Sequence, residues 1–231
     1  MIKYITTTLQ SLRIPLSVEL KGSGPLIFSE SDNDIGWLYH FEVSDEWRDY
    51  YVIYAGPVTK NFQPDISKIK LDQSVPVRID SGCTTGIAFG DKTCECKDQL
   101  GLAIQLIRKN ALGIVIHIPS QDGRGMGIDF KLRTLYLQHV DDLDTISAAR
   151  SITGSDNIDR RTYHGAIGIL NYLGLDSRQK LNIATNNPDK IEAFISAGYK
   201  NIDRISMNIK KTKLTKKHLN AKKQHLNHKI N

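Results

Sequence analysis

The stretch VRIDSGCTTGIAFGDKTCECKDQL, residues 77–100, changes character twice along its length. It begins as the end of an apolar segment, residues 75–80, that is typical of a buried β-strand. Three cysteines among small and polar residues follow, and from residue 98 apolar side chains recur with the spacing of an α-helix. A strand that leads through a loop into a helix indicates an α/β unit, with the cysteines placed where the strand ends.

The rest of the chain divides around this stretch. Residues 1–75 alternate extended, aromatic-containing segments, such as 37–43 and 50–56, with turns, which is typical of antiparallel strands. After residue 100, strands are predicted at 114–118, 181–185 and 201–205, and helices at 129–140, at 166–173 and from Pro188 to near Gly198. Gly174 is expected to end the second of these helices and Asn187 to cap the third.

These elements predict one mixed domain of the α/β (mixed α+β) class over residues 1–231. Its parts are a β-rich N-terminal part (1–75), a part that carries the chemical motifs (76–205) and a basic C-terminal tail (206–231). No internal repeat or low-complexity linker suggests a second domain.

The net charge of +6 is concentrated at one end of the chain. Nine Lys and Arg residues and no acidic residue fall within 204–231, which leaves 22 basic and 25 acidic groups in the remainder. Leu214, Leu219 and Leu226 of this tail lie at roughly helical spacing, which favours a packed helix over a nucleic-acid-binding arm. We therefore do not expect nucleic acid as a partner.

The composition is that of a globular protein, with 40% hydrophobic residues. No segment approaches the roughly 20 consecutive apolar residues of a membrane span. The first 20 residues have mixed polarity and no apolar core of a secretory signal. A cytoplasmic protein without a membrane partner is expected.

The three cysteines of the chain, Cys83, Cys94 and Cys96, form one cluster in the sequence. Cys94 and Cys96 are too close for an easy mutual disulfide, and an odd number of cysteines does not build a disulfide framework. Three thiolates can fill three corners of a tetrahedron around Zn²⁺ and leave the fourth open for water, as in catalytic zinc sites. The alternative is that the cysteines are buried and chemically inert.

Three further motifs carry groups that suit an anion. The segment QDGRGMG, residues 121–127, offers a glycine-rich turn with Arg124, although such turns often only connect elements. The segments DRRTY (159–163) and TNNPDK (185–190) each precede or begin a predicted helix. A solvated turn and a helix cap are the alternatives for these two.

The order and spacing of the motifs resemble the GTP cyclohydrolase II family. The matching blocks are VRIDSGCTTGIAFGDKTCECKDQL, SQDGRGMGIDFKLR, LDTISAARSI, IDRRTYHGAIGIL and LNIATNNPDKIEAFISAGY, which together span about residues 75–205. The tail segment HLNAKKQHLNH (218–228) is similar to the family's C-terminal YLxTKxxKxGH segment.

The resemblance implies a homodimeric zinc enzyme that hydrolyses GTP. It implies opening of the imidazole ring at C8 with release of formate and pyrophosphate, to give a 2,5-diamino-6-ribosylamino-pyrimidinone 5′-phosphate, as the first step of riboflavin biosynthesis. By the same resemblance, Cys83, Cys94 and Cys96 hold one Zn²⁺ per chain and Mg²⁺ accompanies the triphosphate. Asp159 matches the proton acceptor, and Arg161 matches the nucleophilic or phosphate-handling arginine. The nucleotide-contacting positions are matched by Arg78, Ser81, Gln99, Asp122, Gly123, Arg124, Thr145, Thr185 and Lys190.

Several positions depart from the family's pattern. Gly82 stands where the family has glutamate, Thr93 where it has arginine, and Leu135 where it has an active-site tyrosine. Tyr136 follows directly, but neighbouring helical residues are turned by about 100°, so it does not simply replace the missing ring. Two alternatives therefore stay open: a relative that acts on another purine nucleotide, and a non-catalytic nucleotide-binding protein with a structural zinc.

Overall fold

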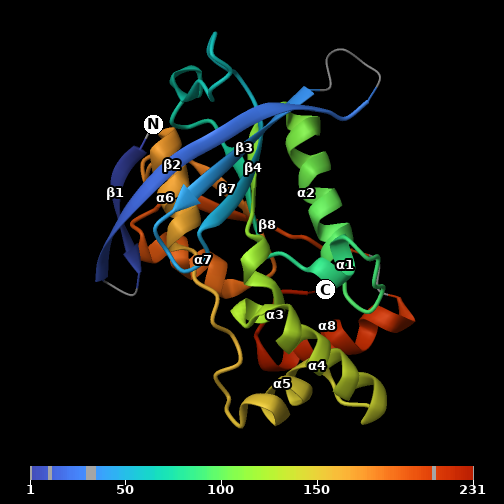
Figure 1. Cartoon of the computed structure of the whole chain (residues 1–231). Helices are drawn as coiled ribbons and strands as arrows, with labels where there is room; N and C mark the ends of the chain where they lie inside the picture. The colour runs from blue at the N-terminus through green and yellow to red at the C-terminus, as the bar shows by residue number, and fades with distance from the viewer. Residues whose placement is uncertain (1, 10–11, 30–34, 210–211, 231) are drawn as a thin grey trace.

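A computed structural model describes residues 2–9, 12–29, 35–209 and 212–230. Its centre is an eight-stranded sheet with the order β1-β2-β3-β4-β6-β5-β7-β8 (Figure 1). The strands are β1 (Ile2–Leu9), β2 (Leu12–Ile27), β3 (Ile35–Val43), β4 (Asp49–Ala55), β5 (Val75–Asp80), β6 (Gly113–His117), β7 (Leu181–Ala184) and β8 (Ile202–Ile205). The expected single mixed α+β domain is confirmed.

The first half of the sheet is antiparallel, as the sequence predicted. Strands β1 to β4 pair antiparallel in chain order, and β4 pairs antiparallel with β6. In β3 the side chains of Tyr39, Phe41 and Val43 are buried while those between them are more exposed. This alternation puts one face of the strand into the core.

The second half of the sheet is parallel and determines where a ligand can bind. β5 lies between β6 and β7 and pairs parallel with both, and β7 pairs parallel with β8. The chain therefore leaves β5 toward one side of the sheet and later returns to its other side. In parallel sheets the crevice beyond the carboxyl ends of such strands is the usual place for a ligand.

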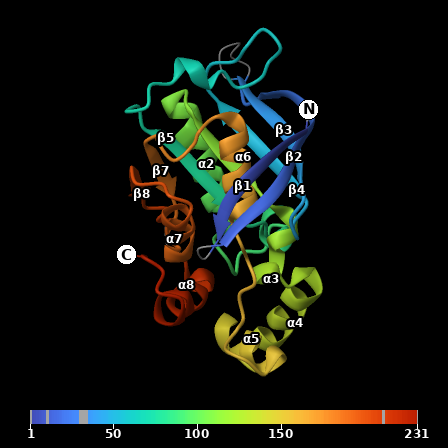
Figure 2. The same ribbon diagram turned by 90° about the vertical axis from the view of Figure 1, so that its left-hand side faces the viewer.

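Helices cover both faces of the sheet. α2 (Cys96–Asn110) packs its Ala103 and Ile107 against Val115 of β6. On the other face lie α6 (His164–Leu173) and α7 (Pro188–Ser196), beneath which sits the main core. β1 and β2 curve over α6 (Figure 2).

A smaller group of helices lies beyond the carboxyl ends of the parallel strands, in the lower part of Figure 1. It consists of α3 (Asp122–Gly125), α4 (Gly127–Val140), α5 (Thr145–Thr153) and α8 (Lys213–His225), with the short α1 (Thr84–Ile87) beside it. Single 3-10 turns occur at Ile66–Lys68 and Pro119–Gln121. The predicted helix in the basic tail is confirmed as α8, while residues 210, 211 and 231 of that tail lie outside the described residues.

The helix boundaries follow local signals in the sequence. The Asn187 side chain accepts a hydrogen bond from the backbone N–H of Asp189, and Pro188 is the first residue of α7, as predicted. Gly174 ends α6 in the left-handed conformation with φ of 96°. None of the described helices combines the length and apolarity that crossing a lipid bilayer requires.

The loop between β3 and β4 packs directly onto the start of α6. The Asp45 carboxylate accepts hydrogen bonds from the Tyr50 hydroxyl and from the backbone N–H of Trp47. A Cβ atom on Gly165 would lie 2.1 Å from Asp45 Oδ2 and 2.2 Å from the Tyr50 hydroxyl oxygen. The loop can approach α6 only because residue 165 has no side chain.

The variant Gly165→Ala is expected to lower the free energy of unfolding by about 2 kcal/mol, because the added methyl group must displace a buried carboxylate or a tyrosine ring. Gly101→Ala is the matched control, since a Cβ there meets nothing within 4 Å. That change should leave stability unchanged or raise it by up to about 1 kcal/mol. Urea denaturation followed by circular dichroism measures both, and equal stability of the two variants would contradict this packing.

Candidate functional site

Two adjoining cavities of about 640 and 500 Å³ lie beyond the carboxyl ends of the parallel strands. The first, here called the cysteine-side cavity, reaches from the cysteines to the glycine-rich turn and α8. The second, the strand-end cavity, lies over the ends of β5 and β7. Residues that line both are Ser81, Gly82, Cys96, Arg161, Lys222 and His228. Because they share this wall, the cavities form one continuous candidate site.

The three cysteines come together at one end of the site. Their sulfur atoms all lie within 4.8 Å of one another, and Cys83 Sγ and Cys94 Sγ are 3.7 Å apart. All three cysteines are free of disulfides. A Cβ atom on Gly86 would lie 2.9 Å from Cys94 Sγ and 3.3 Å from Cys83 Sγ, so this glycine keeps open the space in which the sulfurs converge.

The surroundings of the sulfurs favour negative charge on one of them, because hydrogen bonding with Cys83 raises the pKa of the Cys94 and Cys96 thiols. Hydrogen bonds from Cys94 and then from Cys96 hold the pKa of the Cys83 thiol well below its usual range. Burial alone would lower the pKa of Lys131, but the nearby charge on the cysteine sulfurs outweighs it and raises that pKa. Three converging sulfurs next to a buried lysine match the donor set of a thiolate-bound divalent metal such as Zn²⁺.

The glycine-rich turn aims Arg124 into the cysteine-side cavity. Gly123, Arg124 and Gly125 all adopt positive φ angles, of 59°, 60° and 77°. The Arg124 guanidinium donates to Thr145 Oγ1 at 3.1 Å, while its Nη1 atom is buried without a partner in the described part of the chain. Burial lowers the pKa of Arg124 to about 10, so the side chain is a charged donor at neutral pH.

Asp122 joins the glycine-rich turn to the cysteine loop. Its Oδ2 atom accepts from the backbone N–H of Thr84 at 2.8 Å, and its Oδ1 atom accepts from the backbone N–H of Gly123 at 2.7 Å. The N–H of Gly123 is therefore used inside the turn and does not point freely at a ligand. The carboxylate of Asp122 fixes the position of Arg124 relative to Cys83.

Predicted nucleotide-contacting residues from four elements line the strand-end cavity. They are Arg78 of β5, Ser81 after β5, Gln99 of α2, Thr185 after β7 and Lys190 of α7. Arg78 donates to Gln99 Oε1 at 3.2 Å and to the Ala184 carbonyl oxygen at 3.1 Å. Lys190 Nζ donates to the Ile79 carbonyl oxygen at 2.7 Å.

Positive charge is crowded in this cavity. Arg78 and Lys190 are both buried. Burial, and then the charges of Arg78 and Arg161, lower the pKa of Lys190 well below its usual range. An anion bound in the cavity would relieve this repulsion.

Arg161 stands between the two cavities, and Asp159 holds it there. Arg161 Nε donates to Asp159 Oδ1 at 2.8 Å, and the terminal nitrogen Nη2 donates to Oδ2. Burial alone would raise the pKa of Asp159, but the charge of Arg161 outweighs it and lowers that pKa. Asp159 lines neither cavity; it lies in a neighbouring groove with Asp189 and Glu192.

Buried polar atoms without partners gather around the site. Among the described residues, the cavity-lining atoms of this kind include Arg78 Nε, Gln121 Oε1, Arg124 Nη1 and His228 Nε2. An unpaired buried polar group costs about 1–3 kcal/mol, and most native proteins hold only a few. Their concentration here indicates a surface built to bind a polar ligand.

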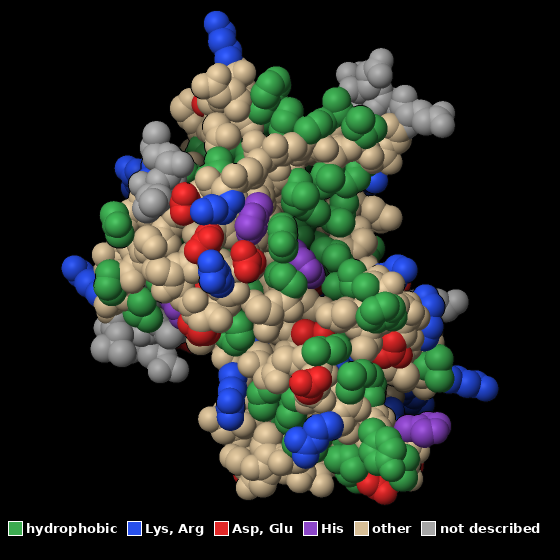
Figure 3. Space-filling view, in the orientation of Figure 1, with side chains coloured by type: hydrophobic (Ala, Val, Ile, Leu, Met, Phe, Trp, Pro, Cys, Tyr) green, Lys and Arg blue, Asp and Glu red, His purple; other side chains and the backbone are tan. Residues whose placement is uncertain are grey.

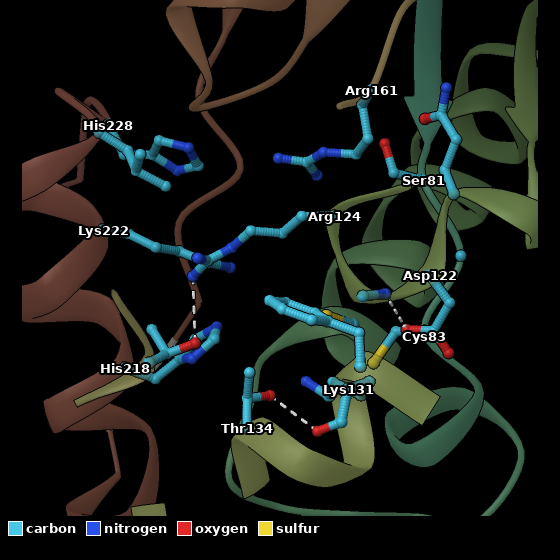
Figure 4. A pocket seen from close by; sticks show the side chains of 17 residues that line it. Ser81, Cys83, Asp122, Arg124, Lys131, Thr134, Arg161, His218, Lys222 and His228 are labelled. Carbon is cyan, nitrogen blue, oxygen red and sulfur yellow. Dashed lines mark hydrogen bonds between the residues drawn. The ribbon is translucent and has the colours of Figure 1, made fainter. Parts of the chain in front are cut away.

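The C-terminal helix α8 and the residues that follow it supply a wall of the site that the sequence analysis did not assign to them. His218, Lys222, Leu226 and His228 line the cysteine-side cavity, opposite Arg124, Arg161 and Cys83 (Figure 4). The spacing of Leu214, Leu219 and Leu226 indicated a helix in the sequence, but the many lysines of the tail gave no sign of which side chains face the cavity. Phe130, Lys131 and Thr134 of α4 were missed as well.

The departures from the family's pattern have different structural settings. Neither Leu135 nor Tyr136 lines a cavity, and Tyr136 is 63% exposed, in agreement with the prediction that it does not replace the missing tyrosine. Gly82 has φ of 62°, and a Cβ there would meet the Pro119 carbonyl oxygen at 2.8 Å. The turn before Cys83 is thus built in a form that the family's glutamate does not fit.

Comparisons with known proteins agree on one family. The family model described as GTP cyclohydrolase II matches residues 39–206. The chain is 32% identical over 191 residues to GTP cyclohydrolase-2 of Picrophilus torridus, covering 83% of this chain and 90% of that protein. It is 35% identical over 179 residues to the riboflavin biosynthesis protein RibBA of Endomicrobium trichonymphae, covering 77% of this chain but only 43% of that relative. With GTP cyclohydrolase-2 of Xylella fastidiosa it shares 33% identity, again over less than half of the relative.

Gly86→Ala is expected to weaken binding of a thiolate-coordinated divalent metal at least about tenfold, because the methyl group would enter the space between Cys83 and Cys94. Competition with a colorimetric zinc chelator measures the affinity. The control Gly101→Ala should bind metal as the wild type does. Unchanged affinity in Gly86→Ala would show that the cysteine cluster is not a metal site of this geometry.

Proposed function

Because this chain belongs to the GTP cyclohydrolase II family, a family of hydrolases, we propose that it opens the imidazole ring of GTP at C8 and releases formate and pyrophosphate. The product would be a 2,5-diamino-6-ribosylamino-pyrimidinone 5′-phosphate, the first intermediate of riboflavin biosynthesis. One observation carries the proposal: the cluster of three cysteines, of which Cys83 and Cys96 line the cavity, adjoins the same continuous cavity as the incompletely paired Arg78 and Arg124.

The proposal assigns one Zn²⁺ to Cys83, Cys94 and Cys96. The fit is supported by sulfur atoms within 4.8 Å of one another and by the absence of a side chain at Gly86, which would otherwise fill the space. A zinc ion bound there supplies Lewis acidity and lowers the pKa of an attacking water.

The triphosphate is assigned to the cationic part of the site. Arg124 reaches it from the cysteine-side cavity, Arg78 and Lys190 from the strand-end cavity, and Arg161 from the wall between them. Each charge-assisted hydrogen bond to a phosphate oxygen contributes about 1.5–3 kcal/mol. Mg²⁺ accompanying the triphosphate is part of the proposal because it would neutralise charge that these donors leave uncovered.

Asp159 and Arg161 are assigned to the phosphate chemistry. The paired carboxylate holds the guanidinium toward the cavity, so Arg161 can bind the α-phosphate in a fixed orientation. The resemblance assigns proton acceptance to Asp159. Both of its carboxylate oxygens accept hydrogen bonds from Arg161 and it lies outside the two cavities, so its proposed part here is to orient Arg161. Gln99, Asp122, Gly123, Thr145 and Thr185, with Ser81, are proposed to position the nucleotide or the residues that touch it.

A second candidate is hydrolysis of another purine nucleotide by the same site. The turn at Gly82 favours it, because the positive φ and the 2.8 Å approach to the Pro119 carbonyl oxygen leave no room for the family's glutamate. The backbone conformation at Gly82 therefore excludes the carboxylate that the family places beside the metal. A non-catalytic protein with a structural zinc is the third reading, and the same assay separates the three.

The homodimer implied by the resemblance and the cytoplasmic location expected from the composition and the N-terminal sequence stay predictions. Hydrophobic side chains gather at the surface over α4, at the lower right of Figure 3. Ile128, Leu132, Tyr136 and Val140 follow one another at helical spacing there and are 38–63% exposed.

Purified protein supplied with Zn²⁺ and Mg²⁺ is expected to release formate and pyrophosphate from GTP, and not from ATP. Arg161→Ala should lower the rate on the order of 100-fold, because it removes a positioned donor to the reacting phosphate. Arg160→Ala, at the exposed neighbouring position, is the control and should retain activity.

Coupled assays for formate and for pyrophosphate follow both products. Release from another purine nucleotide in place of GTP would establish the second candidate. Tight binding of GTP without either product would contradict the enzyme and favour the non-catalytic reading.

A further inference from the structure

The segment that follows β8 returns to the site. Met207 near its start and Lys229 near its end are both hydrogen-bonded to Asn186. The Asn186 side chain accepts from the backbone N–H of Met207 and donates to the Met207 carbonyl oxygen, both at 3.0 Å. The backbone N–H of Lys229 donates to the Asn186 carbonyl oxygen at 2.9 Å. Asn186 is the second residue after β7 and lines the strand-end cavity, so both contacts of the segment lie at the wall of that cavity.

Between these two points, α8 packs onto the small group of helices. Ala221 is buried in a cluster with Ile146 and Ala149 of α5, against which Phe130 and Leu226 also pack. Leu219 is buried while Leu214 is 61% exposed, which gives the helix one inward face. The inward face carries His218 and Lys222 into the cysteine-side cavity (Figure 4).

A buried ion pair joins α8 to the cysteine loop. Lys222 Nζ donates to Glu95 Oε1 at 2.6 Å, and Glu95, between Cys94 and Cys96, is only 2% exposed. Breaking such a buried pair from one side leaves an uncompensated charge, so the contact resists separation of the helix from the loop.

His228 lies at the junction of the two cavities, on the side opposite Arg161 (Figure 4). Its Nε2 atom is buried and has no hydrogen-bond partner among the residues that the structure describes. Burial, and then the charges of Lys222 and Arg161, lower the pKa of His228 to about 3, so its ring is neutral at physiological pH. In the tautomer that carries its proton on Nε2, the ring offers an N–H donor without adding to the crowded positive charge.

We propose that the C-terminal segment, residues 212–230, completes the nucleotide site, with His228 Nε2 donating to a phosphate oxygen of the bound nucleotide and the Glu95–Lys222 ion pair holding the segment in place. This inference rests on the proposed function, since it requires that a nucleoside triphosphate binds in the two cavities. A phosphate oxygen is the group chosen because His228 faces Arg161 across the space that Arg124 also enters. Lys222 acts as a positioning residue, because Glu95 already occupies its ammonium group.

The first test is equilibrium binding of an α,β-methylene-bridged GTP analogue and of guanosine to the zinc-loaded protein. His228→Leu should weaken the analogue about 10- to 100-fold, which is the loss expected for one hydrogen bond to a charged group, and should leave guanosine binding unchanged. His228→Gln, which can place an N–H near the same point, should recover part of that affinity. His225→Leu is the matched control at an exposed position of α8 and should bind both ligands normally.

The outcomes distinguish this inference from the proposed function. If the wild type binds the analogue and His228→Leu binds it equally well, the contact is wrong while the proposed function stands. An equal loss for guanosine would place His228 against the base or ribose and overturn the phosphate contact. If the wild type binds neither ligand, the proposed function itself fails.

The second test asks whether the Glu95–Lys222 ion pair anchors residues 212–230. Lys222→Ala should speed hydrogen–deuterium exchange of residues 212–230 at least about tenfold, because Glu95 loses its buried partner. Lys223→Ala, on the exposed side of the same helix, is the control and should exchange as the wild type does. Zinc content measured on the same samples separates loosening of the segment from loss of metal, and unchanged exchange in Lys222→Ala would overturn the anchoring role.

Discussion

The parallel pairing of β5 with both β6 and β7 is the constraint on which the site depends. Since parallel strands end at the same edge of a sheet, the segments after these three strands must meet. The first carries Ser81 and Cys83, the second Asp122 and Arg124, and the third Thr185. Segments far apart in the chain thereby supply the cysteine side and the cationic side of one cavity.

The charges that line the site suit an anionic ligand. Arginines and lysines from five elements line the cavities, with Arg78 and Lys190 buried, and the carboxylates near them already accept hydrogen bonds. Asp159 holds Arg161, Glu95 holds Lys222, and Asp122 accepts from backbone N–H groups. The cations left with unpaired donors, above all Arg78 and Arg124, are the ones available to a ligand. Because a buried donor without a partner destabilises the fold, we expect a bound ligand to pair with these donors.

Structural features that depend on neighbouring residues could be predicted from the sequence. Features that depend on contacts between residues far apart in the chain could not. The helix that begins at Pro188 and the end of α6 at Gly174 follow from capping, which acts over a few residues. The convergence of the cysteines followed from their spacing. In contrast, the role of Glu95 depends on Lys222, 127 residues later, and nothing in the local pattern around either residue indicates the pair. The conformation at Gly82 is likewise fixed by the approach of Ile118 and Pro119, so the sequence showed a missing glutamate but not a backbone that excludes it.

A crystal structure of the zinc-loaded protein with an α,β-methylene-bridged GTP analogue tests the account most directly. The account predicts an anomalous zinc signal among Cys83, Cys94 and Cys96, with the imidazole edge of guanine facing it. It also predicts the phosphates between Arg124 and Arg161, within hydrogen-bond distance of His228. A nucleotide bound outside the two cavities, or a zinc ion away from the three sulfurs, would contradict it.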